Sequence, residues 1–280
     1  MQLTFLGTGT SMGVPVIGCR CAVCTSPHPH NRRLRTSALL KVAGKQLLID
    51  AGPDLRQQLL AAQVDRLDAV LLTHAHADHV AGLDDLRPLN MAQRSVMPLY
   101  GSAQTLADVR ARFDYAFSDS SAGSTRPQLE LNAVQPGTPF LLDGLEVLPL
   151  AIEHGTWAIT GFRIGRLGYV TDASAIPLAS LDSLYGLDVL VLNALRAAPH
   201  PTHFSLEQAL GVIAQLQPER ALLVHTTHDL EYAATNALLP EHVRLAYDGL
   251  TLDITDDPSV NQEVRYKSAS RSDNCDNQHV

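Results

Sequence analysis

Hydrophobic positions along this chain fall into short runs, and amphipathic segments separate several of them. A run of four to eight apolar residues is typical of a strand, whereas apolar residues three and four positions apart are typical of a helix. The pattern predicts strands at residues 3–6, 37–42, 46–49, 69–72, 145–152, 159–164, 168–171, 189–192 and 221–224, and helices at residues 54–62, 103–113 and 206–215.

The composition is that of a globular protein with a sizeable core. Hydrophobic residues make up 45% of the 280 positions and charged residues 18%, which is the balance of ordinary folded domains. The length allows one large domain or two ordinary ones. Because only 5% of the residues are aromatic, the core must consist mostly of Leu, Val, Ala and Ile.

The formal net charge of −8 disfavours nucleic acid as a partner, because nucleic-acid-binding proteins usually present a basic surface. A small substrate with one or two phosphates remains compatible with this charge. No apolar stretch reaches the roughly 18–20 residues of a membrane helix, and no signal-like segment opens the chain. Together with the clustered thiols, these features predict a cytoplasmic protein without membrane association.

The densest group of reactive side chains lies at residues 73–79, which read Thr-His-Ala-His-Ala-Asp-His directly after an apolar run. His74 and His76 are two residues apart, so on an extended chain they point the same way. Asp78 and His79 follow where the chain is expected to turn into a helix. Imidazole and carboxylate groups in this number suit two adjacent ions of zinc, manganese or iron.

Three further residues that can bind metal, His154, Asp172 and His225, end apolar runs elsewhere in the chain. Strand ends position side chains at loop-lined clefts, where sites are built. The expected ligands are His74, His76 and His154 for one ion and Asp78, His79 and His225 for the other, with Asp172 bridging the pair. In two-metal hydrolases such ions lie about 3.5–4 Å apart and share a water that they activate.

This order of motifs, His-Ala-His-Ala-Asp-His followed by His154, Asp172 and His225, resembles the metallo-β-lactamase superfamily of metal-dependent hydrolases. The resemblance covers nearly the whole chain, to about residue 253. It implies an α/β fold of the four-layer αβ/βα sandwich type, in which two sheets pack face to face with helices outside. It says less about the substrate, because the scaffold hosts many chemistries.

Both halves of the chain supply expected ligands, so we expect one domain with internal pseudo-symmetry. A polar stretch rich in Ser and Gly, at residues 118–126, separates the halves. The hydrolase domain is expected to span residues 1–257. The composition then turns to Ser, Asn, Asp and Gln, which predicts a disordered tail at residues 258–280.

Three of the four cysteines, Cys19, Cys21 and Cys24, fall within six residues, and the fourth is Cys275. Three thiolates in a tight loop lack one ligand for a closed tetrahedral zinc site. His228, three residues beyond the last expected catalytic ligand, is the candidate for that position. The alternatives are a chance cluster of free thiols and a disulfide within the loop, although such near neighbours pair poorly.

The Cys-x-Cys-x-x-Cys loop after a Gly-Thr-Gly opening, together with the late His-x-x-His, is similar to the PhnP-type phosphodiesterases. Members of that family act on a ribose cyclic phosphate in the carbon–phosphorus lyase pathway. The resemblance implies a small, cyclic phosphodiester substrate and a catalytic pair of ions that is commonly manganese. It also implies one structural zinc ion held by Cys19, Cys21, Cys24 and His228, and a role for His203 beside the leaving group.

His203 lies in a loop just ahead of a predicted helix, which Ser205 and Gln208 are expected to start. An imidazole suits proton donation to a departing alkoxide. His200 is the rival, and without the resemblance a loop histidine with no catalytic role explains the sequence equally well. With the resemblance, we expect His203 to be the general acid and Asp78 to ligate a metal ion and orient the attacking water.

Three weaker signals lie near the expected site. Asp50 ends a predicted strand, and either a bond to the metal-binding loop or a turn cap would explain it. Gly7, Gly9 and Gly13 lack the lysine and the helix of a phosphate-binding loop, so they predict a backbone turn at the cleft edge. An arginine of residues 32–35 is a candidate phosphate anchor.

The leading hypothesis is a metal-dependent phosphodiesterase that uses two divalent ions, Mn²⁺ or Zn²⁺. A tRNA 3′-processing nuclease, a lactonase or a thioesterase on the same scaffold is the alternative hydrolase. The acidic charge argues against tRNA processing, and the lack of a dedicated helical C-terminal half argues against a glyoxalase II type of thioesterase. A non-catalytic accessory protein with an intact metal site is a third hypothesis, and a homodimer stays open.

Overall fold

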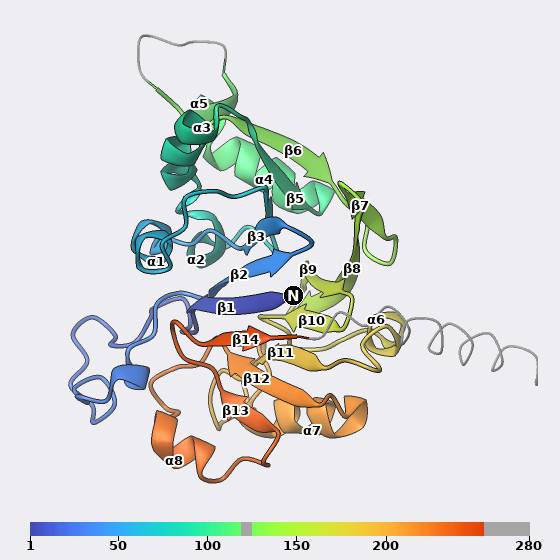
Figure 1. Ribbon diagram of the computed structural model, residues 1–280. Coiled ribbons are helices and arrows are strands. Elements are labelled where there is room, and N and C mark those ends of the chain that lie inside the picture. Colours follow the sequence, from blue (N-terminus) through green and yellow to red (C-terminus); the bar gives the residue numbers. More distant parts are fainter. Residues whose placement is uncertain (119–124, 255–280) are drawn as a thin grey trace, which may run out of the picture.

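The computed structural model describes residues 1–118 and 125–254 and folds them into two seven-stranded sheets. The expected domain boundary at residue 257 and the expected tail at residues 258–280 lie outside these residues. Figure 1 shows α1 to α5 and β2 to β6 in the upper part of the molecule and α7, α8 and β11 to β13 in the lower part.

The first sheet has the strand order β14-β1-β2-β3-β4-β5-β6. Its strands are antiparallel from β14 to β3 and parallel from β3 to β6. The C-terminal strand β14 therefore returns to the sheet that the N-terminal half builds. The strands are β1 (Gln2–Gly7), β2 (Ser37–Val42), β3 (Lys45–Ile49), β4 (Ala69–Leu71), β5 (Met97–Gly101), β6 (Leu129–Ala133) and β14 (Thr251–Asp253).

The second sheet has the order β13-β12-β11-β10-β9-β8-β7. Its strands are antiparallel from β7 to β10 and parallel from β10 to β13. The carboxyl ends of β10, β11 and β12 therefore lie at one edge. The strands are β7 (Phe140–Leu142), β8 (Leu145–His154), β9 (Trp157–Ile164), β10 (Leu167–Val170), β11 (Val189–Asn193), β12 (Arg220–Val224) and β13 (Val243–Leu245).

Helices cover the outer face of each sheet (Figure 1). Two short 3-10 helices, η1 (Pro29–Asn31) and η2 (Leu83–Leu86), lie in the connections. The α-helices are α1 (Leu55–Ala61), α2 (Ala77–Val80), α3 (Arg87–Gln93), α4 (Ala103–Arg112), α5 (Asp114–Phe117), α6 (Leu178–Asp182), α7 (Leu206–Leu216) and α8 (Tyr232–Asn236).

Strand β3 shows how side chains divide between the layers of the core. Leu47 and Ile49 face the second sheet and join the cluster between the sheets, whereas Leu48 faces outward and joins the cluster that includes α1 and α4. Successive side chains of a strand point to opposite faces, so a strand buried on both faces must be apolar throughout. This explains why the chain carries continuous apolar runs rather than a strict alternation.

The arrangement confirms the predicted α/β four-layer sandwich. Every predicted strand and helix is present, with ends within two residues of those predicted. The strands that the pattern missed have specific reasons: β7, β13 and β14 have three residues each, β5 contains Pro98, and β6 is only partly buried. None of the helices in the described part of the chain combines the length and apolar character that a membrane span requires.

Candidate active site

The expected catalytic ligands stand at the carboxyl ends of strands from both sheets. The ring centroids of His74 and His79 lie 4.2 Å apart, those of His74 and His154 5.4 Å, and those of His79 and His225 5.6 Å. The seven side chains follow or end four strands: His74, His76, Asp78 and His79 follow β4, His154 ends β8, Asp172 follows β10 and His225 follows β12. The structure therefore brings all seven together.

His74, His76 and His154 form one group, with a ligand-type nitrogen of each within 4.8 Å of the others. Nε2 of His74 lies 3.0 Å from Nδ1 of His76. The hydroxyl of Thr73 donates to Asp50, so it accepts a hydrogen bond from Nδ1 of His74. Since a neutral imidazole carries one proton, Nε2 of His74 presents a lone pair to the group.

His154 has its tautomer fixed in the same way. Its Nδ1 donates to the backbone carbonyls of Asp172 and Thr202, at 2.8 and 2.7 Å. Its Nε2 is left unprotonated, and second partners of this kind orient metal-binding histidines in general. Lone pairs that face one another repel unless a cation lies between them, so the donor set of this group fits a divalent metal ion.

Asp78, His79 and His225 form the second group, again with ligand-type atoms within 4.8 Å. Nε2 of His79 lies 3.2 Å from Asp78 and 3.4 Å from Oδ2 of Asp172, whereas Nε2 of His225 lies 3.1 Å from Oδ1 of Asp172. Although carboxylates are near, Nε2 of His79 is buried without a hydrogen-bond partner in the described chain. Asp172 also groups with His74 and His79, so its two oxygens stand where a bridging ligand would.

The electrostatic field at the second group favours a cation. Burial alone would lower the pKa of His79, but the surrounding carboxylates, Asp172 foremost, raise it well above its ordinary value. Burial alone would raise the pKa of Asp172, but His225 and His79 hold it well below the ordinary range. The carboxylate of Asp172 is therefore ionised at neutral pH, and a divalent ion would satisfy the charge that otherwise draws a proton to His79.

Two other imidazoles are held neutral. Burial lowers the pKa of His74 well below its ordinary value. Burial also lowers the pKa of His225, to about 4, although Asp172 and Asp78 act in the opposite direction. Metal ligation requires unprotonated imidazole, so both side chains are in the state that an ion needs.

Asp50 accepts three hydrogen bonds from residues 73–79, the metal-binding loop. Its carboxylate accepts the backbone N–H of Thr73 at 2.8 Å, the hydroxyl of Thr73 at 2.7 Å and Nδ1 of His79 at 2.7 Å. The structure therefore favours the bond to the metal-binding loop over the turn cap as the explanation for Asp50. The third bond leaves the proton of His79 on Nδ1 and turns Nε2 toward Asp78 and Asp172.

Three residues of this site have a left-handed backbone. Asp50, Asp172 and His225 have positive φ angles of 61°, 59° and 55°, a left-handed conformation that residues other than glycine rarely adopt. Each follows a strand, so the left-handed turn lifts the side chain out of the sheet toward the metal groups. Strain of this kind persists where the surrounding structure enforces it, often at functional sites.

A cavity of about 380 Å³ opens over the two groups. This volume suits a small molecule rather than a folded macromolecule. Its described lining consists of Ser11, His76, Asp78, His154, Thr156, Trp157, Asp172, Thr202, His203 and His225.

His203 reaches this cavity from the loop before α7. Its Nε2 lies 3.0 Å from Oδ1 of Asp172, and its Nδ1 lies 2.8 Å from the hydroxyl of Thr202. His200 contacts His203, with their Nδ1 atoms 3.3 Å apart, but it is not part of the cavity lining. Ser205 and Gln208 form a capping box at the start of α7, and this fixes the loop that carries His203.

The cysteine loop meets His228 as the spacing predicts. Nδ1 of His228 lies 3.5 Å from Sγ of Cys19, 3.7 Å from Sγ of Cys21 and 3.1 Å from Sγ of Cys24. A tetrahedron with zinc–sulfur bonds of about 2.3 Å and a zinc–nitrogen bond of about 2.1 Å has sulfur–nitrogen edges of roughly 3.6 Å. These cysteines are free, without disulfides, so the donor set fits a closed zinc site.

The three candidate phosphate anchors, Arg32, Arg33 and Arg35, are not among the described residues that line the cavity of about 380 Å³, and two of them have partners elsewhere. Arg33 is 2% exposed and donates to the hydroxyl of Thr226 and to the carbonyls of Thr227 and Leu230. Arg35 makes an ion pair with Asp54 at 3.1 Å. Both guanidinium groups serve the fold, because loops that meet at the metal sites need their own buried backbone groups satisfied.

The glycine-rich opening forms the backbone turn that was expected. Gly9 lies in bridges to Arg35 and Thr226, and its N–H donates to the carbonyl of Leu34. A Cβ at Gly7 would collide with the carbonyl oxygen of Arg35. Glycine is needed here because the backbones pack so closely.

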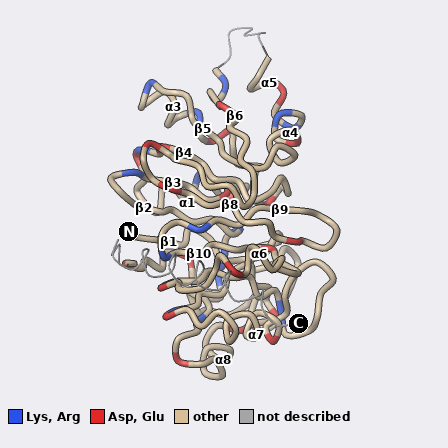
Figure 2. Tube along the Cα trace, turned by 90° about the vertical axis from the view of Figure 1, so that its right-hand side faces the viewer, with Lys and Arg blue, Asp and Glu red and all other residues tan. Residues whose placement is uncertain are grey.

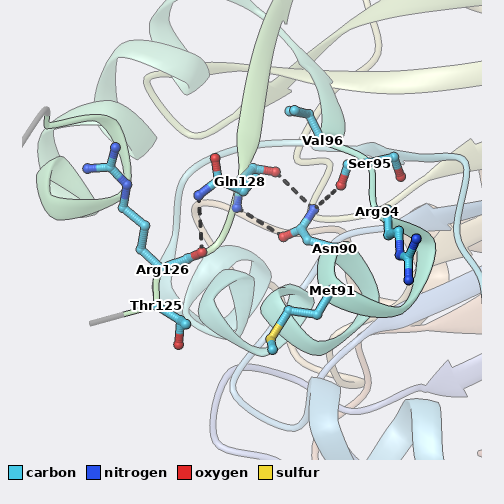
Figure 3. A pocket seen from close by; sticks show the side chains of 8 residues that line it. All are labelled: Asn90, Met91, Arg94, Ser95, Val96, Thr125, Arg126 and Gln128. Atoms are coloured by element: carbon cyan, nitrogen blue, oxygen red, sulfur yellow. Dashed lines mark hydrogen bonds between the residues drawn. The ribbon is translucent and has the colours of Figure 1, made fainter. Parts of the chain in front are cut away.

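A larger cavity, of about 530 Å³, lies beside α3 and β6 (Figure 3). Its lining in the described chain contains no imidazole, carboxylate or thiol: Asn90, Met91, Arg94, Ser95, Val96, Thr125, Arg126 and Gln128. Asn90 and Gln128 hydrogen-bond to each other there, at 3.0 Å. The candidate active site is therefore the cavity of about 380 Å³, which the His and Asp side chains line.

Residues 45–226 match the family model of the beta-lactamase superfamily domain. The chain belongs to this superfamily of metal-dependent hydrolases.

Within the superfamily the chain is close to the PhnP family. A solved structure of a new diphosphatase from the PhnP family is 42% identical and has a TM-score of 0.84, covering 90% of this chain and 96% of the other. An octanoyltransferase of Porphyromonas gingivalis is 41% identical over 89% of this chain, but the chain spans about half (51%) of that longer protein. A ribonuclease Z of a Mycobacterium species is 30% identical, over 70% of this chain and 69% of that protein.

Proposed function

We propose that this chain hydrolyses a small phosphodiester, such as a ribose cyclic phosphate, with two divalent metal ions. The observation that carries the proposal is the convergence of His and Asp side chains from four strand ends on one cavity of about 380 Å³. The likeness to a diphosphatase of the PhnP family supports phosphorus as the centre of attack.

The two groups of side chains divide the metal binding. When bound, Mn²⁺ or Zn²⁺ ions in this site would lower the pKa of a water and neutralise charge on the phosphoryl oxygens. Asp78, which also lines the cavity, would orient the attacking water. The proposed ligands are His74, His76 and His154 for one ion, Asp78, His79 and His225 for the other, Asp172 for both, and Cys19, Cys21, Cys24 and His228 for a separate structural zinc ion.

His203 is the proposed general acid. Its Nδ1 is fixed by the hydroxyl of Thr202, and its Nε2 faces the cavity beside Asp172. Nε2 is therefore the atom that would pass a proton to the departing alkoxide oxygen. The ring stacks parallel to that of His225, with centroids 5.1 Å apart, so its position relative to the metal-binding residues is set by packing.

Charge supports a small substrate over a nucleic acid. Basic and acidic positions are interspersed along the trace in Figure 2, and no broad blue face appears in that view. A nuclease needs a basic surface that follows the phosphate backbone. We therefore rank tRNA processing below hydrolysis of a small phosphodiester, although a ribonuclease Z is among the relatives.

Hydrolysis of a diphosphate is the second candidate. The solved structure that supports it is described as a diphosphatase and is 42% identical to this chain. Both reactions place a water in line with phosphorus and need a leaving oxygen opposite. They differ in the leaving group: a phosphate leaves as a stable anion and needs less help from a general acid than an alkoxide does.

A metal-reconstituted activity panel tests the proposal. The substrates are ribose 1,2-cyclic phosphate, 2′,3′-cyclic nucleotides, bis-p-nitrophenyl phosphate, a nucleoside diphosphate sugar, a lactone and a thioester. Turnover of the phosphodiesters, abolished by chelator and restored by Mn²⁺ or Zn²⁺, is the expected result. Turnover of the diphosphate alone would establish the second candidate, and turnover of only the lactone or the thioester would overturn both.

A further inference from the structure

Trp157 lies at the rim of the cavity, and the mechanism above does not use it. It is the single tryptophan of the chain. It begins β9 and pairs directly with the proposed metal ligand His154, across a turn made of Gly155 and Thr156. The residue is 49% exposed, although its ring centroid lies 4.6 Å from that of His76.

The turn that carries Trp157 is held rigidly. Gly155 has a φ of +60°, and a Cβ there would come within 2.8 Å of Cγ2 of Thr202. The backbone N–H of Gly155 donates to the hydroxyl of Ser174 at 2.9 Å. Since His154 at the other end of the turn is also fixed, the backbone of Trp157 is held at the cavity rim beside the proposed metal ligands.

The indole gives an otherwise polar cavity one large flat surface. The remaining lining is mostly hydroxyl, carboxylate and imidazole, which suits phosphate and metal ions. A half-exposed indole at a fixed position is a stacking platform, and every nucleobase has a face that stacks on it. A substrate cation is disfavoured at this place, because the adjacent site would hold two divalent ions and the aromatic surface is a single ring rather than a cage.

We propose that Trp157 is a specificity-determining residue that stacks on the nucleobase of the substrate, so that the substrate is a nucleoside-bearing phosphate ester or anhydride. This inference rests on the proposed function for the chemistry at phosphorus and adds the class of group attached to it. Stacking of one base on an aromatic side chain changes affinity by roughly tenfold or more.

The single tryptophan allows a direct test that does not depend on turnover. Adenosine monophosphate and ribose 5-phosphate are titrated into the metal-loaded protein while the tryptophan fluorescence is followed. We expect saturable quenching by the nucleotide and a dissociation constant at least tenfold weaker for the sugar phosphate. Equal binding of the two ligands, or no quenching by the nucleotide, would overturn the inference.

Kinetics separate stacking from a purely structural role of the indole against His76. For Trp157→Ala, we expect the ratio of kcat/KM for 2′,3′-cyclic AMP to that for ribose 1,2-cyclic phosphate to fall about tenfold. Trp157→Phe should restore most of that ratio, and both variants should keep the wild-type metal content. An equal loss on both substrates, or lost metal, would show that the ring only supports His76. Quenching without turnover of any phosphate ester would instead refute the proposed function alone.

Discussion

Nε2 of His203 lies 3.0 Å from Oδ1 of Asp172, the carboxylate whose two oxygens also face His79 and His225. The proposed proton donor and the proposed bridging ligand are therefore in direct contact. This contact fixes the nitrogen that would protonate the leaving group at the edge of the proposed metal centre.

Replacing His203 by Gln tests its role as the general acid. The amide can still hydrogen-bond to Asp172, but it has no proton to give, so we expect kcat for a phosphodiester with an alkoxide leaving group to fall by about 10² to 10⁴. With bis-p-nitrophenyl phosphate the loss should be much smaller, because p-nitrophenolate leaves without protonation. His200→Gln is the matched control and should change kcat less than threefold. A similar loss on both substrates would remove the general-acid role.

Replacing Asp50 by Asn tests the support of the metal-binding loop. The carboxylate accepts three hydrogen bonds from Thr73 and His79, and an amide must turn its NH₂ group toward one of these donors. Partners of this kind are worth about 10- to 100-fold in metal affinity. We expect that loss in a chelator-competition titration of Asp50→Asn. Asp54→Asn, which alters bonds to Arg35 and Gln57 but to none of the proposed ligands, should bind metal normally, and normal binding by both variants would contradict this role.

Replacing Cys21 by Ser tests the proposed structural zinc site. Loss of one thiolate opens the tetrahedron, so the purified variant should contain about one equivalent of zinc less than the wild type. We expect its Tm to fall by about 5 °C or more, because zinc stabilises only the folded loop. Cys275→Ser, outside the described residues, is the control and should keep both values. Unchanged zinc content in Cys21→Ser would rule out the site.

The carboxyl of Asp248, which is outside the proposed metal sites, is expected to make the stability of the protein depend on pH. Burial raises the pKa of its carboxyl from 3.8 to about 6, against the hydrogen bonds from Leu34 and Thr8. Between these two values the unfolded chain releases the proton first, so the free energy of unfolding decreases as the pH rises and reaches a plateau above pH 6. The decrease from this group is at most about 3 kcal/mol.

Urea unfolding of the wild type and Asp248→Asn, both in chelator, measures this contribution from pH 4 to pH 7. An asparagine can accept from Leu34 and donate to Thr8, so the variant keeps both contacts without the ionisation. The wild type should lose up to about 3 kcal/mol relative to the variant across this range. A difference that is independent of pH would show that the carboxyl is not shifted.

Much of the site could be predicted because its residues follow strongly apolar strands. The run before Thr73 and those before His154, Asp172 and His225 locate strand ends from the sequence alone, and ligand-type residues at such ends stand out. Spacing likewise predicts that the cysteine loop meets His228, since the required fourth ligand must come from a distant segment.

The sequence could not show features that depend on tertiary contacts. The left-handed backbone of Asp50, Asp172 and His225 could not be located from the sequence, because Asp and His adopt this conformation more often than most residues but only in a small minority of positions. Arg33 looked like a surface cation, but its guanidinium is buried against the loop that carries the late histidines. The position of Trp157 at the cavity rim could not be predicted, because the hairpin of β8 and β9 places it beside His76 and no local sequence pattern marks such a position.

Anomalous diffraction from crystals grown with Mn²⁺ and Zn²⁺ tests the central claim most directly. We predict two adjacent peaks about 3.5–4 Å apart, one among His74, His76 and His154 and the other among Asp78, His79 and His225, with Asp172 reaching both. A third peak, at the zinc edge only, is expected among the cysteines and His228. A single catalytic peak, or two peaks that Asp172 does not contact, would contradict the account of a bimetallic hydrolase.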